Sequence, residues 1–424
     1  MNNVLVIAYY FPPLGLSGVQ RTAGFVRHLP KYGWQPTVLT AKPAGYFAYD
    51  ESLWTPIEAM GISVIRTPSL DPTRMFRSYS TVTLPPERKR KVLSSLSNWL
   101  FVPDNKIGWM PFAILKGINQ LKRQRFDLIL STAPPYTGHM IACHLSKKLN
   151  IPLMIDFRDD WVGNPRHDYP TKLHRKIHFS LESKVLNQSS AVISINQQIL
   201  DQLSERHPEL KKITKVIPHG YDERVTLTSK SLQSVKHLRF LYTGVFYDAQ
   251  VPDYFLRGLS YFLSQNPELS TKVHATFAGL VPKGFNQLLK TFNLTENVEF
   301  VGYKQHNVIQ QLQQEADILW MTIGSRAGNN GISTGKLFEY IGTRKPILAL
   351  VPDGAARDTL VRYGATYLAN PTCIDSIIQA FNDIKTDWLN QNLPTPDESF
   401  ASMFNRHRLT ETLTQVFHSV IKSR

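Results

Sequence analysis

The sequence contains few cysteines and no long apolar run. Its two cysteines, Cys143 and Cys373, lie far apart in apolar surroundings, which excludes a disulfide framework and a thiolate metal cluster. We therefore expect a reducing compartment, the cytoplasm. No apolar stretch approaches the roughly 18 residues that a membrane-spanning helix needs. The apolar start at Val4 has no basic leader or cleavage site, so it is predicted to be a buried strand and not a signal peptide.

Acidic residues are also scarce. The chain has 48 Lys and Arg against 33 Asp and Glu, a formal net charge of +15, although only 19% of its residues are charged. Such a balance favours anionic partners, namely nucleic acid, phosphorylated substrates or a membrane surface. The chain has no nucleic-acid-binding motif and its basic residues are scattered, so we expect no nucleic-acid partner.

The sequence does contain a repeated alternation of short apolar runs and helix-length amphipathic stretches, which is typical of parallel sheets covered by helices. Its 424 residues and the polar segment 226–236 indicate two doubly wound, Rossmann-like α/β domains. Because ligands of such sheets bind outside the carboxyl ends of the strands, we expect the domains to face a central cleft that holds the site.

The predicted strands are 4–10, 36–40, 127–131, 153–157, 191–195 and 216–218 in the first domain, and 238–243, 273–278, 298–301, 318–323, 347–350 and one near 366 in the second. The best-marked predicted helices are 18–32, 137–149, 172–187 and 253–265.

Two glycines, Gly15 and Gly18, follow the first strand and stand just before an amphipathic helix. Glycine lets a backbone approach a ligand closely, and a helix start offers amides to an anion. The loop fits phosphate or sugar contact. It is neither a GxGxxG nor a Walker sequence, so ATP or a dinucleotide gains no support. A simple turn is the alternative.

Polar residues also follow two later strands. His139 opens a helix, where it either acts on a hydroxyl or phosphate or is a structural helix-end residue. The segment DFRDDW places four charges, Asp156, Arg158, Asp159 and Asp160, at a strand end, where a polar cleft is expected. Arg158 suits a two-pronged contact with an anion, and Asp159 or Asp160 suits a proton acceptor. An Arg–Asp network that pins the strand end is the structural alternative.

The densest group of candidate residues is GNNGISTGKLFEY in the second half. Glycines and asparagines precede a helix start formed by Ser333, Thr334, Gly335 and Lys336. Amides and a Lys ammonium suit a diphosphate, and Glu339 suits a ribose diol. Lys336 and Glu339 lie three residues apart, so a surface ion pair on a helix is the alternative.

The order and spacing of these segments resemble the retaining glycosyltransferases of family 4, which have the two-domain GT-B architecture. The resemblance covers nearly the whole chain and is carried by YYFPPLGLSGVQRT, PDNKIGW, DLILSTAPPYTGHMIA, DFRDDW, VIPHGYD, LRFLYTGVFYD, STGKLFEYIGTRKPILAL and FNRHRLTETL. It implies an acceptor-side domain at 1–225, on which a C-terminal helix at about 403–424 packs, and a nucleotide-sugar-binding domain at 236–400. The DFRDxW and GKLFEY elements resemble a bacterial polysaccharide or glycan-assembly branch.

The resemblance also implies roles for residues of the donor site. Glu339 matches the second glutamate of the EX7E signature, which holds the donor ribose. The other residues implied to contact the donor are Gly15, Gly18, Gly244, Ser333, Thr334, Gly335 and Lys336.

The sequence departs from the family pattern in three places. Gly331 stands where the first glutamate of the signature would be, and the usual Arg/Lys pair is replaced around 245–251. Lys336 is the first candidate to supply that charge, and Arg257 is a weaker one. The family's active-site His falls near Arg158, which leaves Arg158, His139 and Asp159 as the catalytic candidates.

The implied activity is that of a metal-independent hexosyltransferase without a cofactor. It would move a sugar from a UDP- or GDP-sugar, with retention, to a glycan or polyprenyl-linked acceptor in surface polysaccharide biosynthesis. Asp159 and Asp160 are adjacent and lie in the acceptor-side domain, so a DxD metal site is not predicted. A weakly active or inactive homologue that binds nucleotide sugar or supports a complex is the alternative, and a sugar-nucleotide epimerase is another.

The segment 87–101 is a candidate membrane contact. Four consecutive basic residues, 88–91, precede Leu93, Leu96, Trp99 and Leu100, whose spacing covers one side of a helix. Contact with anionic lipid at the inner face of the plasma membrane would place the site near a lipid-linked acceptor. An ordinary helix packed on the domain is the alternative.

Overall fold

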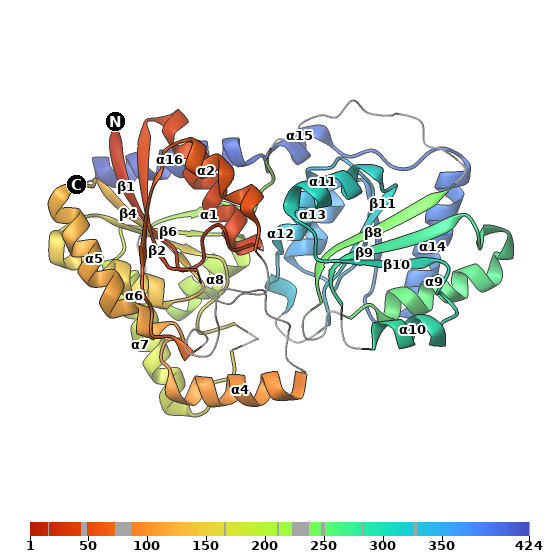
Figure 1. Ribbon diagram of the computed structural model, residues 1–424, viewed down its shortest axis with the longest axis horizontal. Coiled ribbons are helices and arrows are strands. Elements are labelled where there is room, and N and C mark those ends of the chain that lie inside the picture. Colours follow the sequence, from red (N-terminus) through yellow and green to blue (C-terminus); the bar gives the residue numbers. More distant parts are fainter. Residues whose placement is uncertain are drawn as a thin grey trace. The chain divides into compact units, whose positions relative to one another are not determined.

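The structure is a computed structural model of the chain (Figure 1). It describes residues 1–15, 17–43, 49–72, 87–164, 167–209, 212–222, 237–246, 251–281, 284–325 and 329–423, with the backbone alone at 17 and 87–92. The chain forms two compact units: unit 1 is Met1–His219 with Arg406–Arg424, and unit 2 is Gly220–Asn405. The predicted linker 226–236 lies outside the described residues.

Unit 1 is built on a parallel sheet of seven strands in the order β3-β2-β1-β4-β5-β6-β7. The strands are β1 (Asn2–Ile7), β2 (Trp34–Ala41), β3 (Ser63–Thr67), β4 (Leu128–Ala133), β5 (Leu153–Phe157), β6 (Ala191–Ser194) and β7 (Ile213–Val216). Both faces of the sheet are buried, because successive side chains of a strand point to opposite faces. In β1, Leu5 and Ile7 enter one core, and Val4 and Val6 enter the other.

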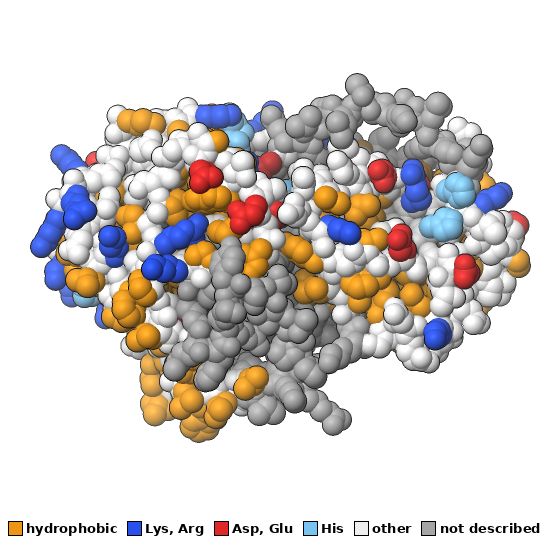
Figure 2. All heavy atoms as spheres, in the orientation of Figure 1, with side chains coloured by type: hydrophobic (Ala, Val, Ile, Leu, Met, Phe, Trp, Pro, Cys, Tyr) orange, Lys and Arg blue, Asp and Glu red, His pale blue; other side chains and the backbone are white. Residues whose placement is uncertain are grey.

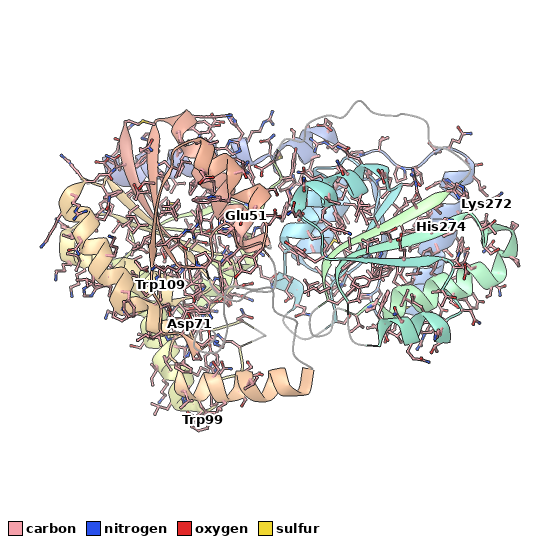
Figure 3. All side chains as sticks on the ribbon, viewed as in Figure 1. Glu51, Asp71, Trp99, Trp109, Lys272 and His274 are labelled. Carbon is pink, nitrogen blue, oxygen red and sulfur yellow. The ribbon has the colours of Figure 1, made fainter. Side chains whose placement is uncertain are left out.

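Helices cover both faces of this sheet. One core contains side chains of α1 (Ser17–His28), α2 (Thr55–Ala59) and α16 (Arg406–Lys422). The other contains side chains of α5 (Met110–Arg123), α6 (Thr137–Leu149), α7 (Lys172–Gln188) and α8 (Gln197–Arg206). The C-terminal helix α16 therefore belongs to unit 1, where the rings of Phe417 and Trp34 lie 4.8 Å apart. Trp109 lies inside the unit, and its Nε1 donates to Thr67 Oγ1 over 2.7 Å (Figure 3).

Unit 2 has a parallel sheet of six strands in the order β10-β9-β8-β11-β12-β13. The strands are β8 (Leu238–Val245), β9 (Val273–Leu280), β10 (Val298–Gly302), β11 (Ile318–Thr322), β12 (Ile347–Leu350) and β13 (Thr366–Ala369). One core includes α9 (Asp253–Gln265), α10 (Phe285–Thr291) and α14 (Ile374–Leu389), and the other includes α11 (His306–Glu315), α12 (Gly335–Ile341), α13 (Ala355–Tyr363) and α15 (Glu398–Ser402). The two Rossmann-like sheets confirm the predicted α/β fold class. In both, the strand order reverses beside the first strand, where such folds bind ligands.

Several predicted elements need new boundaries. The strand predicted at 216–218 is β7, at Ile213–Val216, because Pro218 has no N–H to donate and its carbonyl accepts from Arg21 Nη1 over 2.6 Å. The first strand ends at Ile7 and not at residue 10. The helix predicted at 18–32 ends at His28, and a 3₁₀ turn continues to Tyr32.

The surface of unit 1 carries basic side chains at several separate places on the visible face (Figure 2). No helix in the described parts of the chain is long and apolar enough to span a bilayer. Within those same parts, no three His, Cys, Asp or Glu side chains gather in a way that could hold a metal ion.

Candidate functional site

Arg158 lies at the carboxyl end of the unit 1 sheet, against the first turn of α1. A Cβ on Gly18 would overlap the Arg158 guanidinium, so only glycine lets the arginine approach the backbone of α1 this closely. Arg158 Nε donates to Ala133 O over 3.2 Å, and Nη2 donates to Pro134 O. The side chain is partly exposed. The structure therefore brings together two predicted site residues, Gly18 and Arg158, and Gly15 is buried in the loop before α1.

Asp156, two residues earlier, has a structural role. Its carboxylate accepts from Arg21 Nε over 3.0 Å and from Arg21 Nη2 over 2.9 Å, and both side chains are almost fully buried. Thr132 Oγ1 adds a third hydrogen bond of 3.0 Å. This is the Arg–Asp network that the sequence left open as the alternative, and it ties β4 and β5 to α1.

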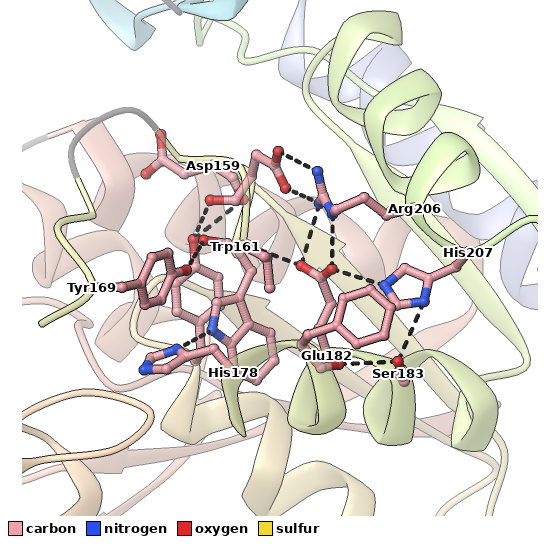
Figure 4. Close-up of polar contacts among 12 residues, drawn as sticks. Asp159, Trp161, Tyr169, His178, Glu182, Ser183, Arg206 and His207 are labelled. Carbon is pink, nitrogen blue, oxygen red and sulfur yellow. Dashed lines mark hydrogen bonds and ion pairs between the residues drawn. The ribbon is translucent and has the colours of Figure 1, made fainter. Parts of the chain in front are cut away.

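Asp160 is also a structural residue (Figure 4). Its carboxylate accepts both Nη groups of Arg206, and Arg206 Nε donates to Glu182 over 3.1 Å. Burial is the main reason why the pKa of Asp160 is raised. Because Glu182 also contacts His207 Nε2 at 2.9 Å, the four side chains form one network that holds α7 and α8 to the end of β5.

Asp159 stands apart from that network. In Figure 4 its carboxylate points away from Arg206, and the side chain is partly exposed. Of the three aspartates in DFRDDW, it is therefore the one whose carboxylate is not committed to the buried ion pairs of Arg21 and Arg206. Asp159 and Arg158 remain predicted catalytic residues.

His139 is fully buried inside unit 1. Its Nδ1 lies 2.9 Å from Ser131 Oγ, and its ring makes an edge contact with Phe157 at 5.0 Å. Burial lowers the pKa of His139 to about 3, opposed by Asp156 and assisted by Arg158. The imidazole is thus neutral and shielded from solvent, which favours the structural alternative over a catalytic role for His139.

We expect unit 1 to lose stability as the pH falls below the ordinary His pKa of about 6.5. With a native pKa of about 3, His139 binds a proton in the unfolded chain before it does so in the native one. The stability that His139 contributes is then fully present above pH ~6.5 and falls by up to about 1.4 kcal/mol for each pH unit below it. Urea unfolding between pH 7.5 and 5 measures this slope. A His139→Gln variant should show a shallower slope, and an unchanged slope would contradict the assignment.

Three further residues, Arg21, His219 and Arg406, lie near Arg158, and none of them was predicted from the sequence as a site residue. His219 is buried, and burial lowers its pKa well below the usual value, assisted by Arg21, Arg158 and Arg406. Arg406, the first residue of α16, packs where a Cβ on Gly24 would stand. The sequence did carry a signal for these residues. Arg21 lies in GVQRT, His219 in VIPHGYD and Arg406 in FNRHR, which belong to the segments that carry the family resemblance.

In unit 2, the end of β8 meets the start of α12. Lys336 Nζ lies 3.5 Å from the centroid of the Tyr242 ring, a cation–π contact. Gly244 has a φ of 125°, and a Cβ there would stand 3.0 Å from Lys336 Cε and 3.2 Å from Nζ. Gly244 and Lys336, both predicted donor-site residues, are therefore in contact.

Desolvation by burial lowers the pKa of Lys336 well below its usual value, and the nearby Glu339 carboxylate opposes that shift. Glu339 itself is partly exposed. The following residue, Tyr340, is buried, and its hydroxyl oxygen accepts from Thr243 N over 2.9 Å. This bond holds α12 to β8 and so fixes Lys336 beside Gly244, with Glu339 close enough to Lys336 to affect its pKa. An anion placed at Lys336 would favour the charged ammonium and so raise this pKa again.

Ser333 and Thr334 precede α12. Ser333 is buried, and Thr334 O accepts from Leu337 N over 3.1 Å. Thr334 Oγ1 is buried and has no hydrogen-bond partner among the described residues. With Gly335, these residues form the turn into α12 that the sequence assigned to the donor.

The model of Glycosyltransferase Family 4 matches residues 17–225. No curated protein matches the sequence. Solved structures match over nearly the whole chain at low sequence identity. Sucrose-phosphate synthase from Thermosynechococcus elongatus has a TM-score of 0.66 at 14% identity and covers 100% of both chains. Anabaena Alr3699/HepE in complex with UDP and glucose has a TM-score of 0.65 at 17% identity, over 99% of this chain and 100% of that one. A glycosyltransferase from Rickettsia africae ESF-5 has a TM-score of 0.64 at 12% identity, over 100% and 99%.

These likenesses show that the chain has the GT-B fold, with two parallel-sheet Rossmann-like units. The matched segment 17–225 supports glycosyltransferase family 4 and includes Gly18, His139, Arg158 and Asp159. The residues of unit 2 that lie around Lys336 are outside that match.

Proposed function

We propose that the protein is a retaining hexosyltransferase that moves a sugar from a nucleotide-diphosphate sugar to a glycan or polyprenyl-linked acceptor. The observation that carries the proposal is the placement of Lys336, with Glu339 near it, beside Gly244 at the switch point of the unit 2 sheet. The solved structure of HepE with UDP and glucose, which shares the fold, supports a nucleotide-sugar donor. Surface polysaccharide biosynthesis is the setting that the sequence resemblance suggests.

The donor would bind with its diphosphate at Lys336 and its ribose diol at Glu339. Breaking the glycosidic bond puts negative charge on the leaving diphosphate, and a cation held in place beforehand stabilises that charge. Lys336 is held in this way by Tyr242 and Gly244. A bound diphosphate favours the protonated, charged form of Lys336. In this proposal that charge takes the place of a metal ion.

Arg158 and Asp159 are the residues that we assign to the reacting sugar and the acceptor. Arg158 is held by two carbonyl groups and by the glycine backbone of α1, which leaves it rigid and partly exposed. Asp159 is the carboxylate that we assign to accept the acceptor's proton. We infer a cytoplasmic enzyme that works close to a membrane-bound acceptor.

Thermal unfolding with UDP, GDP and their sugars tests the donor site, because a ligand of the native state raises the unfolding temperature. We expect one nucleotide to raise it, and Glu339→Ala to weaken that nucleotide about tenfold or more, since a hydrogen bond to a charged group contributes about 1.5–3 kcal/mol. Glu299→Ala, at an exposed position of β10, is the control and should bind as the parent does. Equal binding by the Glu339 variant would overturn the site.

Transfer itself is tested with the nucleotide sugar that binds and a panel of lipid-linked and free glycan acceptors. A product with the anomeric configuration of the donor, read by NMR, supports the proposal, and an inverted product contradicts retention. Donor binding without transfer or hydrolysis favours the inactive homologue. Conversion of UDP-GlcNAc without an acceptor would instead favour an epimerase.

A further inference from the structure

Helices α4 (Glu87–Leu100) and α7 expose large apolar side chains on unit 1. On α4, Leu93, Leu96, Trp99 and Leu100 are 53–68% exposed. On α7, Leu173 is 64% exposed, and Ile177 and Phe179 are also exposed. In the space-filling view, apolar side chains gather at the lower left, where Figure 1 places these helices (Figure 2). We call the four side chains of α4 with Leu173 and Ile177 the two-helix apolar surface.

Side-chain and backbone contacts join the two helices, although more than 70 residues separate the contacting positions in the sequence. The rings of Trp99 and His174 lie 5.1 Å apart, and His174 Nε2 lies 3.4 Å from Trp99 O. Asn98 Nδ2 also donates to Asp168 O, just before α7, over 3.1 Å. These contacts join the C-terminal end of α4, at Asn98 and Trp99, to the N-terminal end of α7. The apolar side chains of the two helices therefore form one continuous surface.

The apolar residues of the two-helix apolar surface lie on one side of each helix, whereas Phe179 lies on another side of α7. Leu93, Leu96 and Leu100 recur at helical intervals, and so do Leu173 and Ile177. Trp99 lies at the lower edge of the molecule in Figure 3, on the side of α4 away from the sheet. All seven tryptophans lie in the described residues, and Trp99 is the exposed one. An exposed Trp beside leucines suits the interface between water and lipid.

Basic residues accompany this surface in the sequence of both helices. Residues 88–91 read RKRK, and Glu87 is the one acid in Glu87–Leu100. On α7, Lys172, Arg175 and Lys176 are exposed, and the first acid is Glu182, which is buried in the Arg206 network. Cations around an apolar surface complement a bilayer with anionic headgroups, each basic residue near it contributing about 1 kcal/mol. A second copy packed face to face would bring the exposed Lys172, Arg175 and Lys176 of both copies together, which disfavours a dimer.

We propose that the two-helix apolar surface docks unit 1 on an anionic lipid bilayer, with α4 and α7 both inserting apolar side chains at the headgroup level. The sequence predicted a contact by 87–101 alone, and α7 is the addition that the structure makes. The exposure, contacts and charge of this surface all belong to unit 1 and are independent of the proposed sugar transfer. A chain that transfers sugar but ignores vesicles would keep the first proposal and lose this one.

Flotation of the full chain with vesicles tests the surface. We expect binding to vesicles of 30% phosphatidylglycerol in phosphatidylcholine, at least tenfold weaker binding to phosphatidylcholine alone, and release by 0.5 M salt. Trp99 emission should shift to shorter wavelength on binding. Two paired variants, Leu96→Ser with Trp99→Ser and Leu173→Ser with Ile177→Ser, should each weaken binding at least tenfold. The matched control is Leu115→Ser, an exposed leucine of α5 outside the surface.

Several results would overturn the proposal. The first three are no binding to anionic vesicles, equal binding to neutral vesicles, and a loss of vesicle binding in Leu115→Ser as large as in the paired variants. The fourth is a chain that self-associates without lipid and becomes monomeric when the α4 residues are replaced. Full binding by the α7 variant would overturn the contribution of α7. The exposed positions make misfolding a minor concern, and unchanged urea unfolding of each variant confirms that loss of binding is a surface effect.

Discussion

Replacing Asp156 by alanine is expected to destabilise unit 1 by about 3–5 kcal/mol, because it leaves the buried Arg21 guanidinium without its carboxylate. The loss also breaks the hydrogen bond from Thr132 Oγ1. Urea unfolding followed by hydrogen exchange of amides in β1, β4 and β5 measures unit 1 separately from unit 2. The effect follows from burial, since neither charge of the pair can turn to water.

Two other aspartates of unit 1 serve as comparisons for this prediction. Asp201→Ala removes an exposed carboxylate that only accepts from Gln197 in the described structure of α8, so it should change stability by at most about 0.5 kcal/mol. Asp159→Ala should leave the fold intact and reduce sugar transfer. If Asp156→Ala unfolds no more easily than Asp201→Ala, the buried pair is not what holds β5 to α1.

The DFRDDW segment shows how far sequence reasoning reaches. Four charges at the end of an apolar strand correctly marked the carboxyl edge of the sheet, because the alternation of apolar runs fixes where a strand ends. The partners of those charges could not be predicted. Arg21 lies 135 residues away from Asp156, and Arg206 lies 46 residues from Asp160, so only the packing of α1 and α8 reveals which aspartates are paired.

The fold was predictable where apolar patterns are strong and less so at the sheet edges. The helices at 137–149 and 253–265 and the strands at 153–157 and 347–350 have the predicted bounds. The edge strand β3 (Ser63–Thr67) was not predicted. It is buried less completely than the central strands, so its sequence SVIRT lacks the continuous apolar run that marks them.

The histidines illustrate the same limit within the site. His139 was a catalytic candidate because it opens a helix. Its position in the sequence does not show that the side chain lies wholly inside unit 1. His219 was not predicted as a site residue, although it lies among three arginines contributed by α1, the end of β5 and α16. Its surroundings depend on the return of the C-terminal helix to unit 1, a contact that local patterns do not encode.

Replacing Lys336 by alanine is expected to weaken nucleoside diphosphate binding roughly 10- to 100-fold, the effect of losing a charge-assisted contact of about 1.5–3 kcal/mol. The parent protein should also bind more tightly as the pH falls. Burial lowers the pKa of Lys336 in the free protein, and Glu339 is the charged group that opposes this shift. A bound diphosphate raises the pKa again, so binding takes up a proton between the lowered value and the ordinary one near 10.4.

Calorimetric titration with UDP or GDP between pH 7 and 9.5 measures this proton uptake, because the heat then depends on the ionisation enthalpy of the buffer. Above pH 7 the terminal phosphate is already ionised, its pKa being near 6, so the slope belongs to the protein. Lys290→Ala, at an exposed position of α10, should keep both affinity and slope. The Lys336 variant should lose both. If the Lys336 variant keeps the pH slope while losing affinity, another group takes up the proton. If the affinity of the parent protein does not change across this pH range, Lys336 is already charged before the nucleotide binds.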